Sequence, residues 1–191
     1  MKFVLIFLIL SFAGNALAEM FCSPAIDQGQ FESLVEETKN HYFPELKDIT
    51  IGISKFHSNA YFLQAQPVIK TLLKKRRNRH YNIQLNTKLL DCPPTPKALE
   101  AILVHELEHI MDYHSLNLFE VTGHGVSYAA SLKTRVSYER ATDYKVLVKG
   151  LHIGLIEYRE WVYQWLSPKE LANKRLIYLT PEEIMADISA H

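Results

Sequence analysis

The sequence is poor in cysteine and carries no excess of charge. It contains two cysteines, Cys22 and Cys92, and neither has the Cys-x-x-Cys partner typical of a zinc finger. Its 21 basic residues balance its 21 acidic ones, so no overall field attracts nucleic acid or an anionic membrane. After the N-terminal segment no apolar run is long enough to span a bilayer. We therefore predict no nucleic-acid partner and no membrane span in the mature chain.

The first 18 residues form the one long apolar segment. Lys2 gives a positive start, Phe3 to Phe12 is almost wholly apolar, and Ala16 to Ala18 has the small-x-small pattern of a cleavage site. This order is typical of a secretory signal peptide. We predict a signal peptide at 1–18 and one compact domain at 19–191, exported to the periplasm or secreted. An uncleaved N-terminal anchor is the alternative.

Export makes the cysteine pair interpretable. An oxidising compartment favours a disulfide between Cys22 and Cys92. The competing interpretation, two further metal ligands, is weaker because neither cysteine has a neighbouring ligand at metal-site spacing.

The most informative stretch is His105-Glu106-Leu107-Glu108-His109. Pro96 to Tyr113 has the spacing of a helix, with Thr95 as a candidate N-cap and an apolar arc opposite the two histidines. Residues four apart lie on one face of a helix, so His105 and His109 can bind one metal ion. Glu106 falls beside that ion, where a general base holds water. The alternative is an amphipathic helix with two surface histidines.

A catalytic zinc needs a third protein ligand and one open position. The pattern His-Glu-x-x-His-x-x-Gly-x-x-His fails here, because Asp112 replaces the glycine and Ser115 replaces the last histidine. A glutamate from a later helix is the other solution, and Glu139 offers it, with Asp143 one turn further on. Asp143 would accept a hydrogen bond from a liganding histidine. The alternatives are a solvated Glu139 paired with Arg135 or Lys145, and ligands from Glu120 or His124.

His105-Glu106-x-x-His109 together with Glu139-x-x-x-Asp143 resembles the gluzincin clan of zinc metallopeptidases. The resemblance covers the two metal-bearing helices and not the rest of the chain. It implies one Zn²⁺ held by His105, His109 and Glu139, with Glu106 as base and Asp143 orienting a ligand.

Alternating residues predict strands at 49–56, 60–66 and 81–86, the first two joined in a hairpin-like turn. We expect an α+β, zincin-like fold: a small, mostly antiparallel N-terminal sheet packed on the metal helix, then a helical C-terminal half. A long helix is expected at 132–151, with further helices from Gly154, Ser167 and Thr180. Tyr81 to Asn86 is either an edge strand that pairs with an extended substrate or an ordinary interior strand.

Peptide hydrolysis also needs a group that stabilises the oxyanion formed when water attacks the carbonyl, and the motif does not identify that group. The candidates are Tyr113, His114, His124, Tyr138 and Arg140. We favour His124 as a second catalytic residue because Gly123 and Gly125 place it in a loop expected to be mobile. Tyr138 and Arg140 point away from Glu139 on an ideal helix.

The sequence predicts a peptide or protein substrate cut by Glu106-assisted attack of water. A zinc amidase acting on cell-wall peptides falls in the same class. A non-catalytic envelope-binding module with a structural metal, and an enzyme completed by a partner, are the alternatives. The basic run is either a contact for anionic envelope polymers or a solvated loop. That run consists of Lys74, Lys75, Arg76, Arg77 and Arg79.

Overall fold

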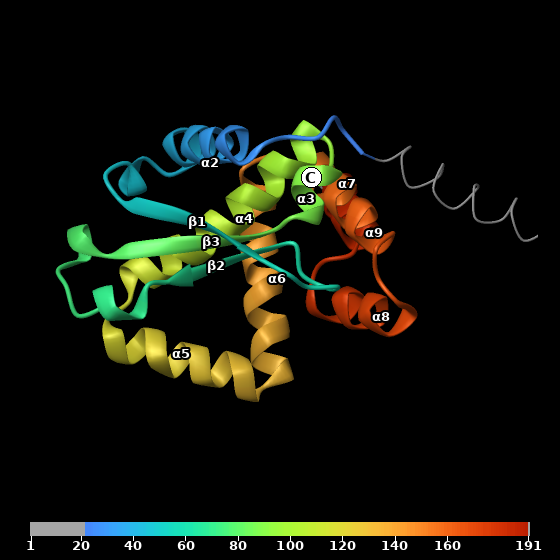
Figure 1. The fold of residues 1–191 in the computed structure, drawn as a ribbon. Helices are drawn as coiled ribbons and strands as arrows, with labels where there is room; N and C mark the ends of the chain where they lie inside the picture. Colours follow the sequence, from blue (N-terminus) through green and yellow to red (C-terminus); the bar gives the residue numbers. More distant parts are fainter. Residues whose placement is uncertain (1–21, 191) are drawn as a thin grey trace, which may run out of the picture.

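The computed structural model describes residues 22–190, so the predicted signal peptide, residues 1–18, lies outside the described residues. A small three-stranded sheet precedes a mostly helical half (Figure 1), which confirms the predicted α+β class. The strands are β1 (Thr50–Phe56), β2 (Leu63–Pro67) and β3 (His80–Asn86). The α-helices are α2 (Gln28–Tyr42), α3 (Lys88–Asp91), α4 (Pro96–Ser115), α5 (Leu118–Ala130), α6 (Leu132–Val148), α7 (His152–Tyr163), α8 (Pro168–Ile177) and α9 (Pro181–Ala190).

The sheet is mixed, with strand order β1-β3-β2. β1 runs parallel to β3, and β2 runs antiparallel to it. The expected hairpin between the first two strands is therefore wrong, as is the mostly antiparallel sheet. The side chain of Asn86, at the end of β3, donates to the backbone oxygens of Ser58 and Tyr61. These bonds hold the β1–β2 link past the end of β3, so β2 enters on the far side of that strand.

Because β3 is paired on both sides, the edge-strand interpretation of residues 81–86 is wrong and the interior interpretation is correct. The alternation that predicted a strand is real, since Tyr81, Ile83 and Leu85 are all buried. Alternation reports burial of one face and says nothing of the neighbours on either side. The free edge that adjoins the metal helix belongs to β2 instead.

Helix α4 forms as the sequence predicts. The side chain of Thr95 accepts a hydrogen bond from the backbone N–H of Ala98, and Pro96 lies in the first turn. The helix packs against β2, α2, α6 and α7, and Leu103 and Leu107 are fully buried. This central position explains why its two histidines are also buried, which excludes the surface-histidine alternative.

Residues 118–130 form helix α5 rather than the expected mobile loop. Asn117 and Glu120 make a reciprocal capping box at its start. A good cap contributes about 1 kcal/mol, comparable with the cost of one exposed helical glycine. Gly123 and Gly125 therefore do not prevent the helix. Val121 is the one fully buried residue of α5, so this helix is only thinly attached to the core.

The C-terminal half is helical, as predicted, but the helix expected at 132–151 ends at Val148. Gly150 has a φ of +80°, a conformation that glycine adopts without steric cost, and α7 begins two residues later. Among residues 22–190, no helix is both long and apolar enough to cross a bilayer.

The basic run lies in the link between β2 and β3, and one of its five residues is not available at the surface. Arg79 is buried, and its guanidinium donates to the backbone oxygen of Leu116 at 2.6 Å. Arg76, which is exposed, donates to the oxygen of Ser115 at 2.7 Å. Both arginines thus satisfy carbonyl groups where α4 ends. Lys74, Lys75 and Arg77 remain exposed as candidates for a contact with an anionic polymer.

Gly154 sets the distance between α4 and α7. A Cβ atom at this position would lie 2.3 Å from the backbone oxygen of Lys97 and 3.0 Å from the Cβ of Ala101. Only a residue without a side chain lets α7 approach so closely. The contact matters for the site because it fixes α4 against the helices that follow it.

We predict that Gly154→Ala destabilises the fold by about 1–3 kcal/mol, because the added methyl group forces the two backbones apart. Urea denaturation of the mature protein measures this change. Gly125→Ala is the matched control: it adds the same methyl group to a helix with nothing within 4 Å, and should stabilise by about 0.5–1 kcal/mol. Equal effects at both positions would contradict the close-packing argument.

Candidate metal centre

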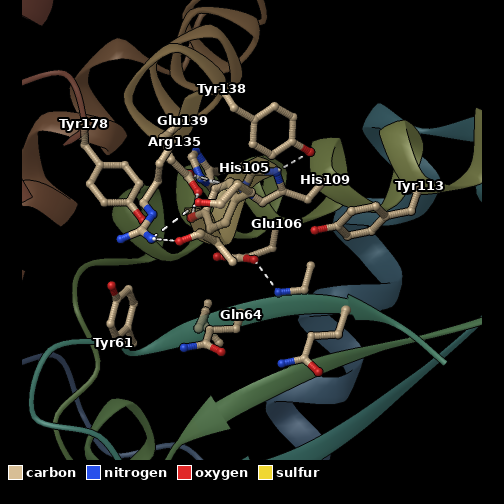
Figure 2. A pocket seen from close by; sticks show the side chains of 15 residues that line it. Tyr61, Gln64, His105, Glu106, His109, Tyr113, Arg135, Tyr138, Glu139 and Tyr178 are labelled. Carbon is tan, nitrogen blue, oxygen red and sulfur yellow. Dashed lines mark hydrogen bonds and ion pairs between the residues drawn. The ribbon is translucent and has the colours of Figure 1, made fainter. Parts of the chain in front are cut away.

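The two motif histidines face each other one turn apart on α4. His105 and His109 are both buried, and their Nε2 atoms lie 3.1 Å apart. Two ring nitrogens at this distance cannot both carry a hydrogen without a clash. Both rings line the same cavity, and Figure 2 shows them next to Glu139 and Glu106.

Helix α6 brings the predicted third ligand to the same point. Glu139 Oε2 lies 3.2 Å from Nε2 of His105 and 3.4 Å from Nε2 of His109. The side chain is 4% exposed, so the solvated alternative is wrong. Lys145 pairs with Glu108 and Asp112 instead.

The three ligand atoms have the spacing that a tetrahedral ion requires. Metal–ligand bonds of about 2.0–2.1 Å at tetrahedral angles separate neighbouring ligand atoms by about 3.3–3.4 Å. The three separations run from 3.1 to 3.4 Å. His105, His109 and Glu139 could therefore hold one metal ion.

Asp143 lies behind the triad, one helical turn after Glu139. Its Oδ1 is 2.9 Å from Nδ1 of His105, which favours a proton on Nδ1 and leaves the Nε2 lone pair for a metal. The carboxylate is itself held by the guanidinium of Arg159 at 2.7 Å and by the backbone N–H of Leu179 at 2.9 Å. Asp143 therefore lies within ion-pair distance of a candidate ligand histidine, and the hydrogen bond expected between them stays a prediction.

The electrostatics of the cluster favour a positive charge at its centre. Burial by itself would lower the pKa of His105, but contacts with Asp143 and Glu139 outweigh it and raise that pKa to about 10. Burial would likewise raise the pKa of Glu139, yet the two histidines hold it well below its ordinary value. Two buried carboxylates around one imidazole stabilise a cation there, whether a proton or a metal ion.

Two tyrosines position the ligands, and the sequence did not single out either for this task. The Nδ1 of His109 lies 3.0 Å from the hydroxyl of Tyr138. The hydroxyl of Tyr128, on α5, donates to Glu139 Oε1. Tyr138 points away from Glu139 on an ideal helix, but its long side chain still reaches His109. No motif signalled Tyr128, because its segment was expected to be a loop.

Glu106 lies beside the triad, at the edge of the sheet. Its Oε2 accepts a hydrogen bond of 2.6 Å from the backbone N–H of Ala65 in β2, drawn as a dashed line in Figure 2. This bond fixes the orientation of the carboxylate between the cluster and the free strand edge. It leaves Oε1 as the oxygen without a bond to β2.

The cluster opens into a cavity of about 400 Å³ between β2, α4 and α6. Of the oxyanion candidates, Tyr113 and Tyr138 line it. His124 packs against the ring of Tyr138 at 4.3 Å between centroids and does not line the cavity. His114 contacts the hydroxyl of Tyr81, and Arg140 pairs with Glu183. The further lining residues that bring polar side chains are Tyr61, Gln64, Gln66, Tyr128, Arg135 and Tyr178.

No protein-family model, curated protein or solved structure matches this chain. The likeness to gluzincins therefore rests on the side chains that α4 and α6 bring together.

We predict that Asp143→Asn weakens zinc binding by about 10- to 100-fold, because the proton of His105 loses its anionic partner. Competition with a chromophoric chelator measures the affinity. Asp91→Asn, an exposed position, is the control and should bind zinc as the parent does. An unchanged affinity in Asp143→Asn, with circular dichroism showing a folded protein, would contradict the positioning role.

Proposed function

We propose that this protein is an exported, zinc-dependent metallopeptidase of gluzincin type on a zincin-like fold. The observation that carries the proposal is the convergence of His105, His109 and Glu139 at the floor of an open cavity, with Glu106 beside them. A purely structural metal site is closed by four protein ligands, whereas a catalytic one keeps a position open. The residues described here offer three ligands and a cavity above them.

A zinc ion in this triad would lower the pKa of a water molecule toward 7 and polarise a carbonyl group. Glu106 is placed to move the proton. Its Oε2 is held by Ala65, so Oε1 is the oxygen that accepts a proton from the attacking water. The same oxygen then passes that proton to the departing amine.

The free edge of β2 supports a peptide as substrate. The backbone oxygen of Phe62 accepts from β3, whereas the N–H of Ala65 points to Glu106. Backbone groups alternate along a strand, so Leu63 and Ala65 direct theirs away from β3. The N–H of Ala65 is taken by Glu106, so an extended peptide can pair with the backbone groups of Leu63 and with the carbonyl of Ala65, and so bring its own carbonyl to the cluster. Gln64 and Ala65 line the cavity beside it.

The hydroxyl of Tyr113 can donate to the oxyanion that forms during attack. Burial, followed by the charge of Glu106, raises the pKa of Tyr113, so this phenol stays protonated and keeps a hydrogen to donate. Tyr138 also lines the cavity, but its hydroxyl lies at Nδ1 of His109, the ring nitrogen that faces away from the cluster. Tyr113 replaces His124 in the proposed mechanism because it lines the cavity and His124 does not.

The second candidate is a non-catalytic binding module with a structural metal. The hydrogen bond between Glu106 and Ala65 supports this candidate, because it gives Glu106 a structural role in joining α4 to β2. In such a module the same cavity and strand edge would hold a peptide without cutting it.

We predict that Glu106→Gln keeps zinc and loses peptide hydrolysis by about 10²- to 10⁴-fold, because the amide cannot accept the proton. Elemental analysis gives the zinc content, and mass spectrometry of a broad peptide mixture gives the cleavage. Glu108→Gln is the matched control, since Glu108 pairs with Lys145 and Lys149 away from the cavity. Zinc in the parent without cleavage of any peptide would favour the binding module.

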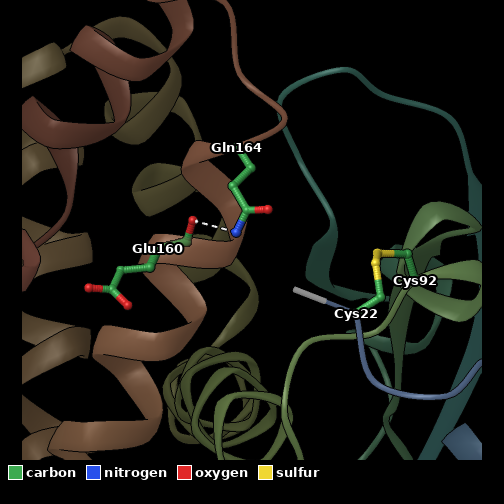
Figure 3. The surroundings of a disulfide bond; sticks show 4 residues. All are labelled: Cys22, Cys92, Glu160 and Gln164. Atoms are coloured by element: carbon green, nitrogen blue, oxygen red, sulfur yellow. Dashed lines mark hydrogen bonds between the residues drawn. A yellow bond between two sulfur atoms is a disulfide. The ribbon is translucent and has the colours of Figure 1, made fainter. Parts of the chain in front are cut away.

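Export is the second part of the proposal, and the disulfide supports it. Cys22 and Cys92 are bonded, as predicted from the sequence, and Figure 3 shows them at the segment that leads into α4. The bridge spans 70 residues, and closing a loop of that length stabilises a fold by about 4 kcal/mol in the chain-entropy estimate. Such a bond forms and persists in oxidising compartments.

We predict that the protein recovered from its native host begins at Glu19 and carries an oxidised Cys22–Cys92 pair. Intact-mass spectrometry with and without reduction reads both features, since reduction adds two hydrogens and opens the bridge. A chain that retains Met1, or two free thiols in the recovered protein, would contradict export.

A further inference from the structure

Lys174, on α8, places a cation next to the metal centre without an anion to match it. Its ammonium lies 3.9 Å from the ring centre of Tyr61 and 4.8 Å from that of Tyr178. Both tyrosines line the main cavity, where Figure 2 shows them on the same side of the cluster. Among residues 22–190, no carboxylate forms an ion pair with Lys174.

The groups around Lys174 disfavour the charged form of its side chain. Burial, and then the positive charge of Arg159 on α7, lower the pKa of Lys174 to about 7. The carboxylates of Glu106, Glu139 and Asp143 act in the opposite direction but only partly offset this effect. The side chain is half-buried, and buried charges are normally paired, so a bound anion could supply the partner that this ammonium lacks.

A small second cavity lies beside the first and has Lys174 in its wall. It measures about 30 Å³ and shares Tyr61, Leu63, His105, Glu106 and Tyr178 with the main cavity. One water molecule needs about 10–15 Å³ of such space, so the cavity has room for about two water-sized groups. The two oxygens of one carboxylate fit this room. The apolar part of its wall is formed by Phe62, Leu63, Ile102 and Val162.

We propose that Lys174 forms a subsite that binds a carboxylate of the substrate next to the bond that is cut. The subsite lies beside Glu106 and His105, so its occupant belongs to a residue flanking that bond. The claim that the carboxylate belongs to a substrate rests on the proposed peptidase function. The claim that Lys174 binds a carboxylate does not. The carboxylate comes either from an aspartate or glutamate side chain or from the free C-terminus of a peptide.

A structural role is the alternative explanation of Lys174. The cation–π contact with Tyr61 would attach α8 to the segment before β2, and the contact with Tyr178 would hold the end of α8, at about 0.5–2 kcal/mol each. If the role is only structural, replacing Lys174 lowers the stability of the protein and reduces the cleavage of every substrate by the same factor. A structural role predicts no change in the preference between an acidic residue and its amide.

The first test is independent of peptide cleavage. In the mature, zinc-loaded protein with ¹³C-labelled lysine, NMR follows the titration of Lys174 with and without N-acetyl-aspartate. Because a bound anion stabilises the ammonium, the pKa should rise from about 7 by about one unit when the probe binds the charged form tenfold more tightly. Lys169, exposed on the same helix, should not respond. A Lys174 titration that ignores the probe overturns the proposal.

The second test compares cleavage of matched peptides. We expect peptides with Asp or Glu beside the cut to exceed their Asn or Gln counterparts about tenfold in kcat/KM, the usual scale for one charge-assisted hydrogen bond. Peptides with an amidated C-terminus and an internal acidic residue test for a side-chain carboxylate. Peptides without acidic residues but with a free C-terminus test for the terminal carboxylate. Either preference supports the subsite. The preference should decline as pH rises through the pKa of Lys174, because the ammonium is then lost.

Lys174→Met keeps the length of the side chain and removes its charge, so it should reduce the acid-to-amide ratio to about one. Lys169→Met should keep the parent ratio, and Lys174→Arg should restore most of it. A ratio unchanged in Lys174→Met overturns the proposal. If the parent cleaves no peptide, the peptidase function fails, and the NMR titration alone decides whether the carboxylate subsite exists.

Discussion

The structure depends on the burial of two carboxylates that share one imidazole. Asp143 and Glu139 approach opposite nitrogens of His105, at 2.9 and 3.2 Å. Negative charges removed from water are costly unless a positive charge compensates them. Arg159 provides part of this compensation through Asp143, and the remainder falls at the point where three ligand atoms meet. The carboxylates where α4 and α6 cross therefore favour a cation between them.

The rest of the fold serves this crossing. Gly154 lets α7 pack closely on α4, and α7 in turn carries Arg159 to Asp143. On the opposite side, Glu106 binds the backbone of β2, so the free strand edge is registered against the same helix. β2, the carboxylate of Glu106 and the candidate ligands are thus fixed relative to one another through α4. A site built on regular elements holds its geometry better than one built on loops.

Local features of the sequence predicted the parts that depend on helical spacing. His105 and His109, four residues apart, had to share a face, and Asp143 had to follow Glu139 by one turn. Sheet order was beyond such reasoning, because the side chain of Asn86 decides the path of the β1–β2 link from far along the chain. The same holds for Tyr128, Tyr61 and Lys174, which come from separate elements and meet only in the folded protein. Residue spacing therefore predicts which side chains share a face of one helix, but it does not predict which residues from other segments line the cavity.

Helix α5 has a further consequence for how this centre accommodates its occupant. α5 packs on the rest of the protein through the buried Val121 and through contacts with α6. It also carries Tyr128, whose hydroxyl donates a hydrogen bond to Glu139. One wall of the cavity is therefore linked to a candidate metal ligand through the hydroxyl of Tyr128. A bulky ligand that displaced α5 outward would break this hydrogen bond and free Oε1 of Glu139. The width of the cavity and the hydrogen bonding of Glu139 thus depend on the same contact.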